Sequence, residues 1–310
     1  MTRWSNEEPG SLLEQELLSL KALLGDEGVS PDLVRFQEAL ARAQAKARAE
    51  VRAAMAAAAE DARDASTRPS SLNGSAQLPR GERRLRQEEV SLDSSILTRL
   101  AAALVEAVPE GSEQVGISAL GKAVEDDDEL LGKIARAAMP GGDARDLAAA
   151  ASKLDLPAEA LLLVGRLLAS PFAWEARLAR GEVLEIDARN EEPRQACRCP
   201  SCGSLPMLAV LGQEDGARRL HCSLCGDAWL APRLACPACG NQDHEKLGTL
   251  CVDESDPRWA EVCDACRRYI KTVDEKRLGG VDALLPRVED VRSMYLDMIA
   301  EEEGYARTSL

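Results

Sequence analysis

The chain has 310 residues, of which 45% are hydrophobic but only 3% aromatic, and its formal net charge is −15 at pH 7. This length suits about two domains of ~100–200 residues each. The acidic excess disfavours a nucleic-acid partner, because it repels phosphate backbones. No stretch offers the ~20 apolar residues of a membrane span, since the longest candidate is interrupted by Arg166 and Pro171.

Two helices are predicted in the N-terminal region, residues 1–65. Leucines recur at helical spacing in residues 10–24. A longer helix is expected to begin at Ser30, a suitable N-cap, and Pro31, which suits the first helical position. Residues 66–84 are rich in Ser, Pro and Gly and are predicted to form a flexible linker. The first ten residues lack the apolar core of a secretory signal, so we expect a cytoplasmic protein with reduced thiols.

A helical bundle domain is predicted over residues 85–181, where several helical patterns follow one another through short connections. One of these patterns covers residues 113–127. The acidic run at residues 125–129 is expected on a solvated loop or helix end. Predicted helix breaks fall at four prolines, namely Pro109, Pro140, Pro157 and Pro171.

The sequence pattern changes after residue 181. There, short apolar runs alternate with Gly, Pro and Asp and indicate strands. Two small four-cysteine modules are predicted there, over residues 182–232 and 233–279. A C-terminal helix and tail, residues 280–310, are predicted to be helical from Val288 to Glu303. The fold class predicted from these patterns is α+β.

Eight of the ten cysteines form four C-x-x-C pairs. A tight turn lets both sulfurs of a pair face one point, and it directs backbone amides at the thiolates. Glycine follows the second cysteine in three pairs, at Gly203, Gly226 and Gly240, and supplies the positive φ that such turns need. In a reducing compartment these pairs indicate metal or redox chemistry more than structural disulfides.

The simplest assignment is two metal sites, each made of two consecutive pairs. Nineteen residues separate Cys202 from Cys222, within the ~15–20-residue spacing of four-cysteine metal modules, and 23 separate Cys239 from Cys263. The first site is predicted to comprise Cys199, Cys202, Cys222 and Cys225, and the second Cys236, Cys239, Cys263 and Cys266. Interleaved pairing, first with third and second with fourth, is the alternative.

Four sulfurs in tetrahedral array suit zinc or a single iron ion, and the spacing fits an iron–sulfur cluster less well. Neither site leaves a position open for Lewis-acid catalysis, so no catalytic residues are predicted. His221 and His244 are disfavoured as replacement ligands, because eight cysteines are already paired.

The remaining cysteines are assigned separately. We expect Cys251 to be a small buried hydrophobe in a strand, and Cys197 to be a spare thiol or a redox-active accessory group that could be exposed. Between Cys199 and Lys271 there are eight basic and ten acidic residues, a net of −2. This balance argues against a nucleic-acid-binding ribbon.

Residues 199–310 closely resemble the formate dehydrogenase accessory proteins of the FdhE type. The resemblance is carried by "CPSCGSLPMLAVLG", "RRLHCSLCGDAWLAPRLACPACG", "CDACRRYIKTVD" and "EEEGYARTSL". In the N-terminal half only the overall helical character agrees. The resemblance implies a helical N-terminal bundle, two rubredoxin-like (zinc-ribbon-like) modules that bind iron through the eight paired cysteines, and a C-terminal helix.

The resemblance further implies a non-enzymatic, cytoplasmic maturation factor that binds the catalytic, molybdenum-bearing subunit of formate dehydrogenase. We expect two metal ions, iron in preference to zinc, and neither a nucleic-acid partner nor membrane insertion, while homo-oligomerisation stays open. The candidate client surface comprises Arg219, His221, Trp229, Arg233, Tyr269 and Lys271, although strand packing explains Trp229 and Tyr269 equally well. The alternatives are a redox-active iron protein that sets the redox state of its client and, more remotely, a zinc-ribbon regulator.

Overall fold

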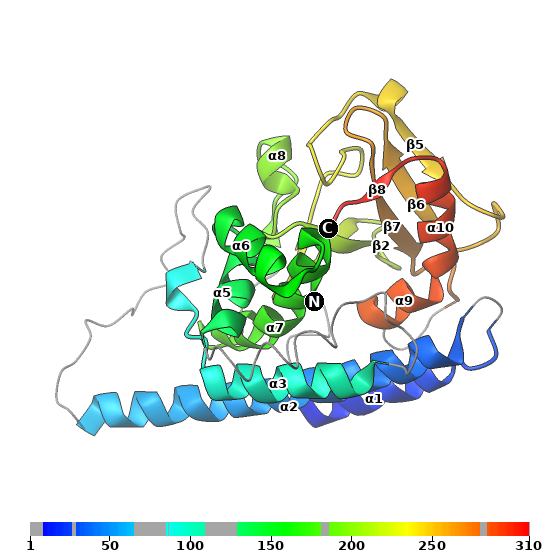
Figure 1. Ribbon diagram of the computed structural model, residues 1–310. Helices are drawn as coiled ribbons and strands as arrows, with labels where there is room; N and C mark the ends of the chain where they lie inside the picture. The colour runs from blue at the N-terminus through cyan, green and yellow to red at the C-terminus, as the bar shows by residue number, and fades with distance from the viewer. Residues whose placement is uncertain are drawn as a thin grey trace.

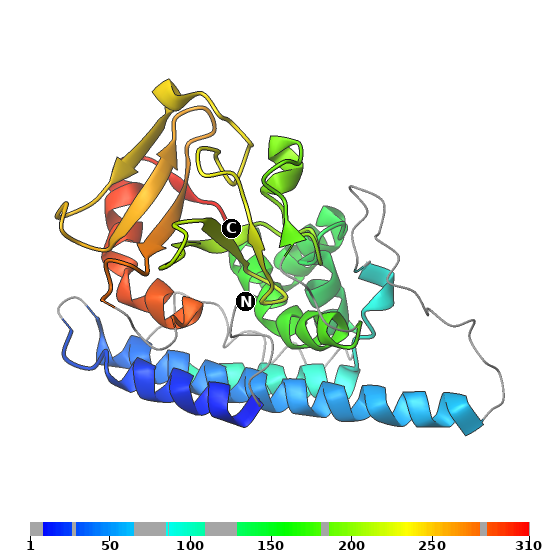
Figure 2. The ribbon, with the colours of Figure 1, turned by 180° about the vertical axis from the view of Figure 1, so that it is seen from behind.

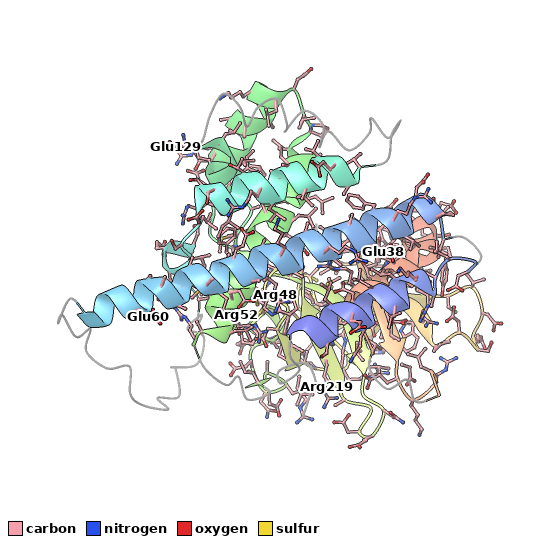
Figure 3. The ribbon with its side chains drawn as sticks, turned by 90° about the horizontal axis from the view of Figure 1, so that it is seen from below. Glu38, Arg48, Arg52, Glu60, Glu129 and Arg219 are labelled. Carbon is pink, nitrogen blue, oxygen red and sulfur yellow. The ribbon has the colours of Figure 1, made fainter. Side chains whose placement is uncertain are left out.

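The computed structural model describes residues 9–26, 29–64, 85, 87–108, 129–180, 186–279 and 284–309. Its base consists of three helices, α1 (Pro9–Lys21), α2 (Pro31–Asp64) and α3 (Ser94–Ala107) (Figure 1). Seen from below, α2 lies between α1 and α3 (Figure 3). The predicted start of α2 is confirmed, because Pro31 is its first residue and the Ser30 hydroxyl accepts the N–H of Asp32 at 3.3 Å.

The bundle above this base contains α5 (Leu130–Ala137), α6 (Ala144–Leu154) and α7 (Ala158–Leu178), preceded by a short 3₁₀ turn, η2 (Gln87–Glu89). The predicted linker, the predicted helix over 113–127 and all of the acidic run except Glu129 lie outside the described residues. In the described part of the chain, no single helix is long and apolar enough to span a membrane. By length and composition α6 and α7 would do so only as a pair bent by 110°.

The predicted helix break at Pro171 is wrong, because Pro171 lies inside α7. A proline has no N–H, so the carbonyl of Leu167, four residues earlier, loses its partner within the helix. The side chain of Gln44 on α2 replaces that partner, with Nε2 donating to the Leu167 carbonyl at 3.1 Å. Because a neighbouring helix supplies the missing donor, α7 continues to Leu178.

The C-terminal half contains eight strands in one sheet within the described chain. They are β1 (Ile186–Asp187), β2 (Pro206–Leu211), β3 (Arg218–Cys222), β4 (Ala228–Leu230), β5 (Leu247–Leu250), β6 (Arg258–Cys263), β7 (Arg268–Asp274) and β8 (Ala306–Arg307). The order is β1-β4-β3-β2-β7-β6-β5, and β8 pairs with β7. Short helical turns, α8 (Pro193–Ala196) and η4 (His244–Lys246), interrupt the connections.

The two predicted cysteine modules share this sheet. Strands β1 to β4 come from the first module and β5 to β7 from the second. The join is the parallel pair β2–β7, in which Leu208 lies opposite Lys271 and Leu211 opposite Asp274. Backbone hydrogen bonds therefore link the two modules directly.

Two helices, α9 (Pro286–Arg292) and α10 (Met294–Glu302), replace the single helix predicted over 288–303. The break lies at Ser293, whose backbone leaves the helical region and whose hydroxyl donates to the carbonyl of Glu289 at 2.6 Å. Beyond the break, α10 covers one face of β6 and β7, burying Leu296 and Ala300 against Ala260 (Figure 2).

The largest core runs through both halves of the molecule. Leu40 of α2 and Phe172 of α7 belong to the same buried cluster as Cys225 and Trp229 of the first cysteine module. A smaller core joins α1, α2 and α9 through Leu20, among others. The predicted α+β class, helical at the N-terminus and with two four-cysteine groups in the C-terminal part, is confirmed.

Candidate metal centres

Four tight turns carry the C-x-x-C pairs. Gly203, Gly226 and Gly240 have φ values of 81°, 66° and 77°, so the predicted left-handed position is confirmed in these three turns. The fourth turn has no glycine there, and Arg267 adopts the same conformation with φ 54°. In this turn the N–H of Arg267 donates to the carbonyl of Cys263 at 2.8 Å.

The first centre gathers the sulfurs of Cys199, Cys202, Cys222 and Cys225, whose ligand atoms all lie within 4.8 Å of one another. The Sγ atoms of Cys199 and Cys225 are 3.6 Å apart, and those of Cys202 and Cys222 are 3.4 Å apart. A tetrahedral ion with bonds of about 2.3 Å to sulfur places its ligands about 3.8 Å apart. The four sulfurs therefore fit such an ion.

The second centre gathers Cys236, Cys239, Cys263 and Cys266 in the same way. The Sγ separations are 3.6 Å for Cys236 and Cys266 and 3.9 Å for Cys239 and Cys263. The structure thus brings consecutive pairs together at both centres, not the interleaved ones. None of the ten cysteines forms a disulfide.

The electrostatic surroundings of the first centre act differently on its thiols. Burial raises the pKa of Cys199 and of Cys225 well above the usual range of a thiol, whereas hydrogen bonds with the neighbouring cysteines hold the pKa of Cys202 well below it. Backbone N–H groups of Leu224 and Cys225 point at the Cys222 sulfur, at 3.3 and 3.4 Å. A bound cation would displace the protons, and these amides then offset part of the thiolate charge.

Helix α7 holds the second turn of the first centre. Arg177 donates from Nε to the carbonyl of Cys225 at 3.1 Å and forms an ion pair with Asp227 at 3.6 Å. The indole of Trp174 lies directly against Gly226, where an added Cβ would sit 2.0 Å from the ring. Neither Trp174 nor Arg177 was predicted from the sequence. Their only signal is the i,i+3 spacing on one helix.

The other turn of the first centre is also covered. The N–H of Leu85, which precedes the bundle, donates to the carbonyl of Ser201 at 2.9 Å. The Ser201 hydroxyl donates to Asp227, which joins the two turns. Buried polar contacts therefore link each turn to the helical half and link the two turns to each other.

Of the two remaining cysteines, Cys251 differs from its prediction, and Cys197 is a thiol outside both four-cysteine groups but is not exposed. Cys251, expected in a buried strand, is exposed because β5 ends at Leu250 and the chain turns outward. Cys197 is buried, and its thiol donates to the carbonyl of Cys236 at 3.2 Å. Burial raises the pKa of Cys197 to about 11. Cys197 thus joins the first module to a ligand turn of the second centre.

Most of the predicted client-surface residues lie inside the protein. Trp229, Tyr269 and Lys271 are each no more than 1% exposed, and His221 lies in β3 with its pKa lowered to about 4 by burial. Arg233 is the one exposed member of the predicted set. Contacts within the chain account for the burial of Trp229, which donates from Nε1 to the carbonyl of Ala196 in α8 at 2.8 Å.

Arg218, which the sequence analysis did not single out, joins the two modules. Its side chain is fully buried and donates to the carbonyls of Pro232 and Ala235 at 3.1 and 2.9 Å. It also forms an ion pair with Glu261 of β6. No pattern in the sequence distinguishes a buried arginine such as Arg218 from an exposed one.

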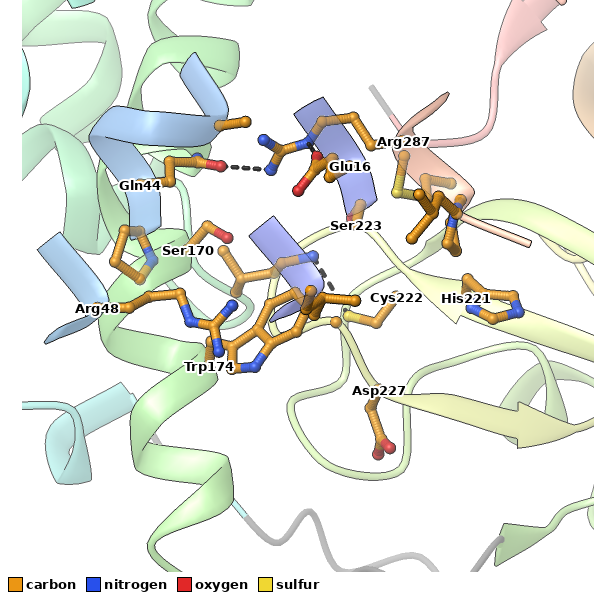
Figure 4. A pocket seen from close by; sticks show the side chains of 18 of the residues that line it. Glu16, Gln44, Arg48, Ser170, Trp174, His221, Cys222, Ser223, Asp227 and Arg287 are labelled. Atoms are coloured by element: carbon orange, nitrogen blue, oxygen red, sulfur yellow. Dashed lines mark hydrogen bonds and ion pairs between the residues drawn. The ribbon is translucent and has the colours of Figure 1, made fainter. Parts of the chain in front are cut away.

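A cavity of about 160 Å³ lies beside the first centre, where α1, α2, α7, the first module and the start of α9 meet (Figure 4). Cys222 and Trp174 line it, and Arg48 lies over the indole with 4.2 Å between the guanidinium carbon and the ring centroid. Arg287 reaches across it to Gln44 and to Glu16. The charged side chains around the cavity pair with one another within the chain. These pairs link the five segments that surround the first centre.

Comparisons with known proteins identify relatives of this chain. A family model described as "FdhE, central domain" matches residues 198–233, and one described as "FdhE, C-terminal domain" matches residues 234–310. Curated proteins named Protein FdhE from Escherichia coli, Shigella boydii and Escherichia fergusonii are 33% identical over 147 residues, 46% of each chain. The chain thus spans about half the length of the curated relatives it matches.

The fold extends the similarity to the rest of the molecule. The crystal structure of the FdhE protein from Pseudomonas aeruginosa matches with a TM-score of 0.55 and 23% identity. The match covers 97% of this chain and 93% of that one. The helical half, which has little sequence signal, therefore shares the fold of that protein.

Proposed function

We propose, from the premise that the chain belongs to the FdhE family through its residues 198–310, that it is a non-enzymatic accessory protein in the maturation of formate dehydrogenase. One observation carries the proposal. Each of the two matched family domains contains one complete four-sulfur centre, the first within residues 198–233 and the second within 234–310.

Each centre, in this proposal, holds one metal ion, iron in preference to zinc. The sulfur separations of 3.4 to 3.9 Å and the all-cysteine ligand groups support one four-coordinate ion per centre, while the preference for iron rests on the family resemblance. A bound ion would neutralise thiolate charge and cross-link two turns that are distant in sequence. With four protein sulfurs per ion, no coordination position is left for a substrate, which supports a structural or redox role over catalysis.

The cytoplasm is the compartment that we assign to the protein. Ten cysteines without a disulfide suit a reducing environment, and exposed Cys251 would oxidise readily elsewhere. The proposed partner is the catalytic subunit of formate dehydrogenase before it leaves that compartment.

We place the contact with that subunit beside the second centre. Arg233, from the predicted client surface, is exposed there, and neighbouring Leu234 is 68% exposed. Both line a groove of about 340 Å³ together with Trp259 and the ligand Cys236. A large exposed apolar side chain next to a groove is typical of a protein-binding surface.

Affinity purification under anaerobic conditions tests the proposal. We expect the catalytic subunit to co-purify with the wild-type chain and with Leu163→Ser, which alters another exposed leucine, on α7. Leu234→Ser should lower its recovery, and Cys222→Ser with Cys225→Ser should remove one ion and lower formate dehydrogenase activity in cells. Loss of recovery with Leu163→Ser as well, or no recovery with the wild type, would contradict this client assignment.

A further inference from the structure

The two centres differ in how the rest of the chain covers them. At the first centre the four cysteines are 1%, 4%, 3% and 0% exposed. At the second, Cys236 and Cys263 are buried but Cys239 and Cys266 are only half-buried. The second centre is therefore the more accessible of the two, through Cys239 and Cys266.

The covering contacts explain this difference. The first centre is enclosed by the bundle, through Trp174 and Arg177 on one turn and Leu85 on the other. Its sulfurs also belong to the largest core, together with Phe172. Exposing them requires the interface between α7 and the first module to open.

The second centre has no such cover among the described residues. One of its turns contacts α8, where Arg194 donates from Nε to the carbonyl of Cys239 at 3.3 Å, and the Cys197 thiol that donates to the carbonyl of Cys236 at 3.2 Å. The other contacts the C-terminal tail, where the Tyr305 hydroxyl donates to Asp264 at 2.6 Å. The contacts made by Arg194 and Tyr305 are exposed, unlike the buried contacts of Arg177 and Leu85 at the first centre.

We propose that the two centres hold their ions with different kinetic stability: the first is a closed structural centre, and the second exchanges its ion with solvent while the fold stays intact. The difference in exchange rests on the metal-binding part of the proposed function, and only the regulatory role drawn from it rests also on the proposed client surface. At the second centre, one cysteine would release the ion to an external ligand, and the freed thiolate would be protonated by the buffer acid. At the first, the same step must wait for the α7 interface to open.

The inference gives the second centre a regulatory role. Its ion can leave without unfolding the core, and the proposed client surface at Leu234 lies in the groove lined by Cys236 and Cys263. Occupancy of the second centre therefore changes the shape of that groove. Occupancy of the first centre maintains the fold.

Metal-release kinetics test the proposal on the full-length chain. The protein is reduced, loaded with Zn²⁺ and mixed with excess 4-(2-pyridylazo)resorcinol, and the absorbance of the chelate is followed. We expect two phases of one ion each, with the slow phase at least about tenfold slower. Urea below the unfolding transition should accelerate the slow phase only, because only that release requires buried surface to be exposed.

Three variants assign the phases. Cys239→Ser should remove the fast phase and leave the slow one. Arg177→Gln should accelerate the slow phase several-fold without altering the fast one, and Arg42→Gln, at an exposed arginine on α2, should alter neither. The wild-type urea dependence does not require any variant to fold.

The outcomes separate this inference from the proposed function. Two bound ions released in a single phase, or equal acceleration of both phases by urea, would overturn the inference alone. Loss of the slow phase in Cys239→Ser would reverse the assignment and overturn it too. A reduced chain that binds no ion would overturn both the inference and the metal-binding part of the proposed function.

Discussion

A buried lysine of the sheet, Lys271, connects the C-terminal helices to the sheet through ion pairs. Lys271 of β7 is 1% exposed, and its Nζ lies 2.6 Å from Asp297 and 2.7 Å from Asp290. Tyr269 donates to Asp297 at 2.7 Å. Burial alone would raise the pKa of Asp290, but Arg307 and Lys271 outweigh it and hold that pKa below the usual range of a carboxyl group. The lysine is therefore a structural cation and not part of a binding surface.

Asp290→Asn is expected to lower the free energy of unfolding by about 1–3 kcal/mol at pH 7, because it removes one charged partner of a buried lysine. A carboxyl group with a depressed folded-state pKa stabilises the protein above its unfolded pKa of about 3.9 and loses that effect as pH falls through the folded value. The difference between wild type and variant, measured by urea unfolding, should therefore shrink below pH about 4. Glu214→Gln, at an exposed position, is the control. A difference independent of pH would refute the electrostatic explanation.

Among the elements, helix α7 determines how the two halves fit together. Its proline is tolerated because Gln44 of α2 satisfies the Leu167 carbonyl, and Gln44 in turn accepts from Arg287 at the start of α9. One turn further along, Trp174 and Arg177 contact the second turn of the first centre. Helix α7 thus contacts α2 on one side and a metal-ligand turn on the other.

Gly226→Ala tests this contact. Its Cβ would lie 2.0 Å from the Trp174 ring, and the residue has φ 66°. Gly216→Ala is a matched control, since Gly216 has φ 60° but no atom within 4 Å of the added Cβ. We expect the control to cost about 1–2 kcal/mol from backbone strain alone. Gly226→Ala should cost about 1–3 kcal/mol more, because the added methyl overpacks the contact. Equal losses in thermal unfolding would show that Trp174 does not hold the turn.

On the scale of the whole molecule, the first centre lies within a core shared by both halves. Its four cysteines, Trp229 and Phe172 belong to the same buried cluster. The sheet then extends this unit into the second module through the β2–β7 pair. An ion held at the first centre would therefore stabilise the contact between the two halves and not only a small local module.

Removal of both ions under reducing conditions should lower the melting temperature by at least about 10 °C, because a structural ion contributes several kcal/mol to folding. Trp229 is fully buried, so its fluorescence should shift to longer wavelength as the core opens. Adding Zn²⁺ back should restore both signals. Unchanged melting of an ion-free chain would show that the thiol groups alone stabilise the fold.

The sequence by itself determined the local features of this protein. Leucine periodicity and the Ser30–Pro31 boundary predicted the base helices, and the C-x-x-C spacing with its glycines predicted the four turns. These features depend on interactions between residues a few positions apart. Each pattern can therefore be recognised within the short stretch of sequence that forms it.

Only the tertiary structure decided which of these local units meet. It joined the two modules in one sheet, kept Pro171 within a helix, exposed Cys251 and buried Lys271. Each outcome depends on a partner far away in the chain, such as Gln44 for the carbonyl freed by Pro171. Side-chain type and spacing specify what a residue can bond to, whereas burial and partner choice result from packing between distant segments.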